Sequence, residues 1–339
     1  MCVAAFAVVV STNVSADHIP GKIVVNNDEW TFSETGFLTK PTDTAQFALN
    51  VANWFTDGNT GNFLAYSTNF GLTGSTLTST MTGAGHTWTV SIAIDFSLPN
   101  LLQYDAIFLA GNAADNTVLI DYVNAGGNVY LAGGTGWYGP IVEAQMWNTF
   151  LNAFGLNFGE YYNLVHVLSG IPVTSAHPIF NNVNYLYYNN GNSVSELDPS
   201  NPDTDILEIW NNEGLIGIYA PTYIEVDIDI KPGSDPNSIN MGAKGTIPVA
   251  ILSTEDFDAA TVDPLTVALA GAEVKLRGKS DAPQAALEDV NGDGLLDLVV
   301  HIIHDGFEPD LGTSEAKLEG ETYSGTPIRG SDSVTIVPT

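Results

Sequence analysis

Apolar and polar positions follow two different patterns along the chain. Over residues 21–220, apolar strand-like runs alternate with stretches of helical spacing, as in 44–55, where Phe47, Val51 and Trp54 share one face. The runs 104–111 and 128–132 are almost continuously apolar, each ends at glycines, and helices are predicted at 117–124 and 142–154. Strands of this kind are buried on both faces. The pattern predicts a three-layer α/β domain with a mainly parallel sheet.

Beyond residue 220 the helical periodicity stops. Short alternating strands are predicted at 225–230, 247–252, 266–269, 298–303, 316–318 and 334–337, separated by turn residues such as the KPGSDPN run at 231–237. We expect an all-β antiparallel sandwich over residues 222–339, after an α/β domain over residues 17–221.

The first sixteen residues, MCVAAFAVVVSTNVSA, have an apolar centre and a small-residue ending that are typical of a secretory signal. The apolar run is too short to span a bilayer. Two interpretations stay open for residues 1–16: a cleaved signal, or a strand that packs within the protein or is donated to a neighbouring subunit. The one cysteine, Cys2, lies in this segment, so no intrachain disulfide is expected.

The charge balance is strongly acidic, with 39 Asp and Glu against 9 Lys and Arg and a formal net charge of −30. Such a surface repels nucleic acid and anionic lipids, so neither is an expected partner. It attracts divalent cations, although solubility in salty surroundings explains the same composition. Export to the cell surface or medium is the expected localisation.

The strand predicted at 128–132 runs into a glycine-rich turn, Gly133-Gly134-Thr135-Gly136. With YDAIFLAG at 104–111, DYVNAGGNVYLAGGTG at 121–136 and AHPIFNNV at 176–183, this region resembles the class I glutamine amidotransferase-like superfamily, which implies a flavodoxin-like fold. Catalytic members carry a cysteine at this turn, where this chain has Thr135. The resemblance therefore implies a degenerate domain without amidotransferase activity.

A ligand pocket near the turn remains an alternative, formed by Gly134, Thr135 and Gly136 together with His177. Backbone N–H groups at such a turn can hold an anion, and nearby aromatic residues can line a carbohydrate site. The competing interpretation is structural: Thr135 caps the next helix and His177 packs in a loop. The aromatic candidates are Trp137, Tyr138, Tyr161 and Tyr162.

The second domain contains a loop, DVNGDGLLD at 289–297, that predicts a Ca²⁺ site. Oxygen-bearing side chains stand at its first, third, fifth and ninth positions, and glycine at its sixth allows a tight turn. The expected ligands are Asp289, Asn291, Asp293, the carbonyl of Leu295, and Asp297. The twelfth position, Val300, lacks the glutamate of an EF-hand, so a further ligand must come from elsewhere. An Asx-rich turn without metal is the structural alternative.

The whole segment resembles a calcium-loop β module that is appended to secreted bacterial and archaeal proteins. The resemblance rests on IDIKPGSDPNSIN at 228–240, GTIPVAIL at 245–252, the loop itself and GSDSV at 330–334. It implies an accessory or assembly role. A second acidic cluster, Asp305, Glu308 and Asp310, is expected to be a solvated loop.

These features predict a secreted, non-enzymatic structural protein of a surface, matrix or filament, stabilised by Ca²⁺ and self-associating through its terminal strands. The alternative is a secreted hydrolase or carbohydrate-binding protein that uses the pocket near Thr135. The missing cysteine favours the first hypothesis. Glycans are left open as a further class of partner.

Overall fold

A computed structural model describes residues 19–136, 138–278, 281–307 and 314–337, and these fall into two units, Pro20–Thr222 and Tyr223–Thr339. The predictions for residues 1–16, for Trp137 and for Glu308 and Asp310 lie outside the described residues. Each unit is considered by itself below.

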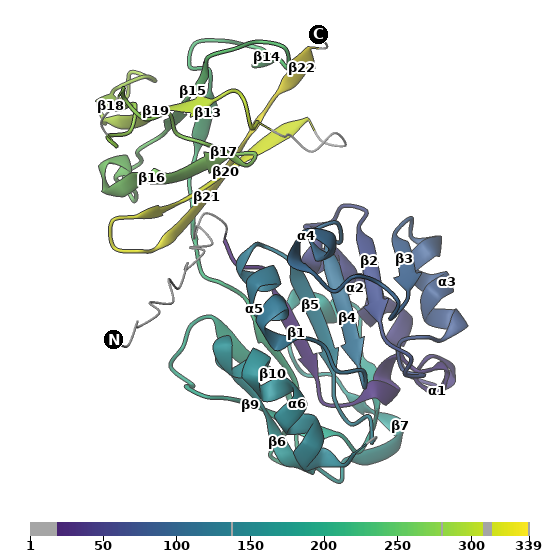
Figure 1. Cartoon of the computed structure of the whole chain (residues 1–339). Helices are drawn as coiled ribbons and strands as arrows, with labels where there is room; N and C mark the ends of the chain where they lie inside the picture. The colour runs from purple at the N-terminus through teal and green to yellow at the C-terminus, as the bar shows by residue number, and fades with distance from the viewer. Residues whose placement is uncertain (1–18, 137, 279–280, 308–313, 338–339) are drawn as a thin grey trace, which may run out of the picture. The chain divides into compact units, whose positions relative to one another are not determined.

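The first unit is built on a seven-stranded sheet with the order β10-β11-β1-β5-β4-β2-β3 (Figure 1). Five of its strands are parallel, and β10 and β11 form an antiparallel hairpin at one edge. The mainly parallel sheet predicted from the buried runs is therefore confirmed. The strands are β1 (Ile23–Asn26), β2 (Asn62–Tyr66), β3 (Thr87–Val90), β4 (Ala106–Ala110), β5 (Asn128–Ala132), β10 (Thr204–Trp210) and β11 (Glu213–Tyr219).

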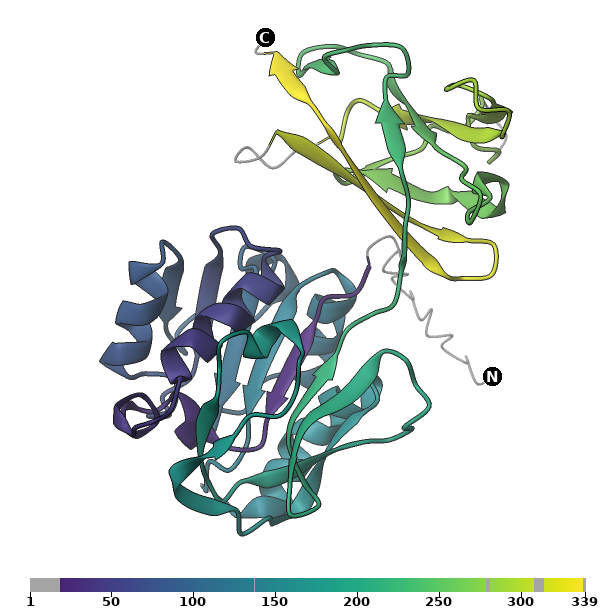
Figure 2. The ribbon, with the colours of Figure 1, turned by 180° about the vertical axis from the view of Figure 1, so that it is seen from behind.

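Helices cover both faces of this sheet, because alternate residues of the buried strands pack into two separate cores. Helices α5 and α6 lie in front of the sheet in Figure 1, and α2 covers the face seen from behind in Figure 2. One core includes α1 (Glu34–Leu38), α2 (Thr44–Phe55) and α3 (Ser75–Gly83), and the other includes α4 (Leu98–Leu101), α5 (Asn116–Asn124) and α6 (Pro140–Ala153).

The alternation of strands and helices predicted up to residue 220 is wrong for the last third of this unit. Residues 156–219 form three antiparallel strand pairs, and the one helical element in this stretch is the short 3-10 helix η2 (Pro178–Phe180), between β7 and β8. These strands mix asparagine and tyrosine with aliphatic residues, so neither the two-residue period of a strand nor the 3.6-residue period of a helix is clear in the sequence. The additional strands are β6 (Leu156–Tyr162), β7 (His166–Pro172), β8 (Tyr185–Asn189) and β9 (Asn192–Glu196).

The second unit contains a five-stranded and a four-stranded sheet that share one apolar core. Most of its strand pairs are antiparallel, but β12 with β21 and β14 with β22 are parallel, which corrects the prediction of a purely antiparallel sandwich. The predicted strand at 225–230 is divided between β12 (Ile224–Glu225) and β13 (Ile228–Ile230). The remaining strands are β14 (Ser238–Asn240), β15 (Thr246–Ile251), β16 (Val262–Leu269), β17 (Ala272–Glu273), β18 (Ala285–Glu288), β19 (Asp297–Ile303), β20 (Glu315–Thr322), β21 (Pro327–Ser333) and β22 (Thr335–Val337), with a 3-10 helix η3 (Ala259–Thr261).

Candidate functional site

The acidic loop at 289–297 connects β18 to β19 and is folded by its own side chains. The Asp289 carboxylate accepts hydrogen bonds from the N–H groups of Gly292 (2.7 Å) and Gly294 (3.1 Å). The Asp293 carboxylate accepts from the N–H of Leu295 at 2.8 Å. Both glycines have φ of 80° and 92°, which other residues rarely adopt. The loop is therefore a tight turn with its acidic side chains held on the inside of successive bends.

The last acidic residue of the loop, Asp297, has a different environment from the others. Its side chain is fully buried, and its two oxygens accept from the N–H groups of Ser253 (2.9 Å) and Val290 (3.0 Å). These bonds join the start of the loop to the segment that follows β15. Asp297 thus fastens the loop to the sandwich, whereas Asp289, Asn291 and Asp293 stay exposed.

Two carboxylates that the sequence pattern did not single out face this loop. Asp227, between β12 and β13, and Glu255, after β15, line one cleft of about 450 Å³ with Asn291, Asp293 and Leu295. They stand far from the loop in sequence, so no local spacing could identify them. Within the described part of the chain, no three His, Cys, Asp or Glu side chains are gathered closely enough to hold a metal ion. The chemistry of the donor set nevertheless fits a hard cation, since all its ligand atoms are oxygens.

The second acidic cluster has one described member. Asp305 lies exposed in the turn after β19.

In the α/β unit, the glycine-rich turn follows β5 at the carboxyl end of the parallel strands. Gly134 and Gly136 have φ of 71° and 72°, and the half-buried Thr135 stands between them. The Thr135 hydroxyl donates to Oε1 of Glu143 in α6 at 2.6 Å, and the Thr135 N–H lies 3.1 Å from both oxygens of that carboxyl. Glu143 is buried, and burial raises its pKa. This side chain braces the turn against α6.

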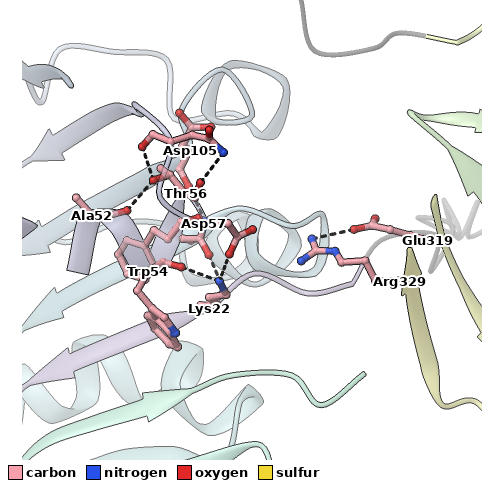
Figure 3. A network of polar contacts seen from close by, with 11 residues as sticks. Lys22, Ala52, Trp54, Thr56, Asp57, Asp105, Glu319 and Arg329 are labelled. Atoms are coloured by element: carbon pink, nitrogen blue, oxygen red, sulfur yellow. Dashed lines mark hydrogen bonds and ion pairs between the residues drawn. The ribbon is translucent and has the colours of Figure 1, made fainter. Parts of the chain in front are cut away.

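The structure does not bring His177 to this turn. The His177 ring lies 5.2 Å from the Trp54 ring, and the carbonyl of Trp54 accepts from Lys22 Nζ at 2.6 Å (Figure 3). Lys22 precedes β1 and pairs with Asp57 at 2.7 Å, whereas Thr135 follows β5, which is parallel to β1. His177 and Thr135 therefore lie at opposite ends of the strands, and the predicted pocket containing both is wrong.

Two further acids lie at the same end of the sheet as Thr135. Asp28 and Glu29 lie two and three residues after the end of β1, and both are buried. Burial raises the pKa of Asp28 to about 7 and the pKa of Glu29 to about 8. Hydrogen bonds oppose both shifts: backbone N–H groups donate to Asp28, and the side-chain amide of Asn69 donates to Glu29 Oε2 at 2.5 Å. The carboxyl of Glu143 adds to both shifts.

The sequence pattern did not predict the burial of Asp28 and Glu29, because Asp and Glu ordinarily occupy exposed positions. Their position right after a buried strand is the one available signal, since ligand sites of open α/β sheets lie at the carboxyl ends of strands. The predicted aromatic candidates are more scattered: Tyr161 is 53% exposed and its hydroxyl donates to Glu213 at 3.1 Å, and Tyr138 is 67% exposed.

Comparisons with protein families, with curated proteins and with solved structures find no match to this chain. No helix among the described residues is long and apolar enough to cross a membrane. The fold and the two sites define the class of protein: an α/β unit with a buried acidic cluster at its strand ends, followed by a β unit with an exposed acidic loop.

Proposed function

We propose that this chain is a secreted, non-enzymatic structural protein of a cell surface, matrix or filament, and that Ca²⁺ stabilises its β unit. The observation that carries the proposal is the cleft in which Asp227 and Glu255 face Asn291 and Asp293. Each of these side chains offers oxygen, and the loop has no glutamate at its twelfth position. Asp227 and Glu255 would supply the missing charge to a cation that needs six to eight oxygen ligands.

The α/β unit supports a non-catalytic role within the same proposal. In chain numbering the five parallel strands lie in the order 3-2-4-5-1, so β3-β2-β4-β5 match the first four places of the 2-1-3-4-5 order of flavodoxin-like sheets, but the first strand of the chain, β1, takes the place of the fifth. The flavodoxin-like order that the amidotransferase-like resemblance implies is therefore met only in part. At the turn where the catalytic cysteine of that superfamily stands, the Thr135 hydroxyl donates a hydrogen bond to the buried Glu143 carboxyl, which also accepts from the Thr135 N–H.

The calcium proposal is tested by calorimetric unfolding of the full chain in Ca²⁺ and in chelator. All six tryptophans lie before residue 223, so tryptophan fluorescence identifies the transition of the α/β unit, and the other calorimetric transition belongs to the β unit. At a Ca²⁺ concentration 100 times Kd, binding to the folded form alone adds about 2.7 kcal/mol. We expect Ca²⁺ to raise the midpoint of the β unit alone.

A matched pair of variants makes this test specific. Asp293→Asn removes a charge from the cleft, and Asp263→Asn is the control, since Asp263, in β16 and outside the cleft, accepts from the N–H two residues on, Leu265, at 3.0 Å, just as Asp293 accepts from Leu295. Asp293→Asn should weaken Ca²⁺ binding at least tenfold, and Asp263→Asn should not. Identical unfolding of the wild type in Ca²⁺ and chelator would refute the calcium site. Electron microscopy of the native protein, with and without chelator, tests the assembly role separately.

A further inference from the structure

Within the described residues, the three sheets of four or more strands end in six edge strands, of which β3 alone has no charged side chain. Natural proteins place charges or proline on edge strands to block pairing with a further strand, and β3, with the sequence TWTV, has neither. The other five edges carry Asp205 and Glu208 in β10, Glu225 in β12, Asp229 in β13, Glu273 in β17 and Glu288 in β18. The edge at β3 is therefore the one left open to another strand.

The free side of β3 presents backbone hydrogen-bonding groups. Among the described strands β3 pairs with β2 alone, in parallel, and the N–H of Ser91, just past its end, donates to the Ala65 carbonyl at 3.1 Å. Alternate residues of a strand direct their N–H and C=O groups to opposite sides, so those of Val90 point away from β2. Val90 is 41% exposed, and Ile92, two residues further on, is 43% exposed. The outward groups are thus at the surface, next to apolar side chains.

The sequence around this edge is also free of charge. Residues 58–94, which include β2, α3 and β3, contain no Asp, Glu, Lys or Arg, although 14% of the whole chain is charged. Two copies of a chain with a net charge of −30 repel each other where their acids come close, and this repulsion is weakest at a neutral edge. A positively charged partner would be attracted to the acidic surfaces elsewhere. The occupant that the neutral edge suits is therefore a second copy of this chain.

Helix α3 lies beside β3 at this end of the sheet and adds a surface that can be buried at low cost (Figure 1). Its threonine hydroxyls already have acceptors within the helix. Thr78, Thr80 and Thr82 each donate to the carbonyl four residues earlier, at 3.1, 2.8 and 2.8 Å. Contact with another chain would therefore leave none of these three donors without a partner.

We propose that two copies of this chain associate through β3, with the two strands paired antiparallel about a two-fold axis, so that the sheets of two α/β units join into one. The outward N–H and C=O groups of each Val90 then bond to the strand of the other copy. The pairing also removes apolar surface of Val90 and Ile92 from water.

This contact deepens the structural role proposed above by naming one interface between subunits, and it rests on that role only for its purpose. A two-fold contact closes on itself, so it forms dimers, and a filament would need a second kind of contact. The interface does not involve the calcium loop, so dimers are expected in Ca²⁺ and in chelator alike.

The test is sedimentation equilibrium of the intact protein over a range of concentrations. Val90→Glu places an acid on β3, where like charges on paired strands repel. Ile209→Glu is the matched control: it adds the same charge to β10, the opposite edge of the same sheet, at a side chain that is 57% exposed. We expect concentration-dependent dimers of the wild type, with a dissociation constant at least tenfold higher in Val90→Glu and unchanged in Ile209→Glu. Added salt should strengthen the wild-type dimer, because it screens the repulsion between acidic chains.

A second variant, Val90→Pro, tests the backbone pairing itself. Proline removes the outward N–H of Val90 and leaves the bond from Ser91 to β2 in place, and edge strands accept proline where the N–H faces solvent. The dimer should again weaken at least tenfold. Urea unfolding followed by tryptophan fluorescence shows whether each variant keeps the folded α/β unit.

Three results would overturn the proposal. A wild type that stays monomeric at every concentration would leave the edge to a strand of another protein. Dimers that are as stable in both folded Val90 variants as in the wild type would place the interface elsewhere. Equal weakening by Val90→Glu and Ile209→Glu would attribute the effect to general charge repulsion. The proposed filament is judged separately by electron microscopy, where dimers without higher assemblies would contradict the filament and leave the β3 contact standing.

Discussion

Glu29 makes the stability of the α/β unit depend on pH in a direction unusual for a carboxyl group. The side chain is 4% exposed, and its pKa is raised from 4.5 to about 8, mainly by burial and further by Asp28 and Glu143. Below pH 4.5 the folded and unfolded chains both carry the proton. Between 4.5 and 8 the unfolded chain releases it while the folded chain keeps it, so stability falls as pH rises.

The magnitude follows from the interval between the two pKa values. At about 1.36 kcal/mol per pH unit, the interval from 4.5 to about 8 corresponds to a loss of about 5 kcal/mol above pH 8. Glu29→Gln cannot ionise, and its amide oxygen can still accept the hydrogen bond from Asn69. We expect the variant to match the wild type near pH 4.5 and to exceed its free energy of unfolding by several kcal/mol at pH 8–9.

The assay is urea unfolding at five pH values from 5 to 9, followed by tryptophan fluorescence, which reports this unit alone. Glu34→Gln is the control with the opposite sign, because hydrogen bonds from Thr76 and Ser75 lower the pKa of Glu34. Its wild-type contribution is present above the unfolded pKa of 4.5 and is lost only below it, so from pH 5 to 9 the Glu34→Gln curve should run parallel to that of the wild type. Parallel curves for the wild type and Glu29→Gln would refute the assignment of a buried, protonated Glu29.

Two further predictions concern packing and the loop. Gly191→Ala should destabilise the α/β unit by roughly 3 kcal/mol or more in urea unfolding, because its Cβ would lie 1.6 Å from the Asn27 carbonyl oxygen. The control is Gly83→Ala, whose Cβ would have no atom within 4 Å and which should be neutral or slightly stabilising. Equal effects of the two substitutions would contradict the close approach at Gly191. Asp297→Asn should destabilise the β unit by roughly 2 kcal/mol in calorimetry, in chelator as well as in Ca²⁺, because an amide side chain cannot accept hydrogen bonds from both the Ser253 and the Val290 N–H. An effect seen only in Ca²⁺ would mean that Asp297 is a metal ligand and that its hydrogen bonds do not stabilise the fold.

The hydrophobic pattern predicted the parallel sheet well and the hairpins poorly, for one physical reason. Strands β4 and β5 are buried at every residue, so their apolar runs are unmistakable. Strand β7, HVLSGIP, is part of a two-stranded pair and is only partly buried, so packing imposes no period on its sequence. Register shifts interrupt both β6–β9 and β7–β8, which removes the alternation further.

The sites divide in the same way between local and long-range information. The acidic loop at 289–297 is local: five positions of one turn carry its pattern, and hydrogen bonds from its own backbone to Asp289 and Asp293 hold that turn. Asp227 and Glu255 come to line one cleft with the loop through tertiary packing across many residues. Residue type is also a poor guide to burial at these sites, since Asp28 and Glu143 are acids of the kind expected at the surface, and only the folded structure shows that they are buried.

The acids of this chain therefore have two physical roles, and the roles have opposite responses to pH. The loop acids Asp289 and Asp293 are exposed and must be ionised to bind a cation, so acid would remove any stabilisation of the β unit by Ca²⁺. Asp28 and Glu29 are buried, and their pKa values of about 7 and about 8 mean that acid stabilises the α/β unit. Since burial and not composition decides which role an acid has, a net charge of −30 does not indicate how many Asp and Glu side chains are charged in the folded protein.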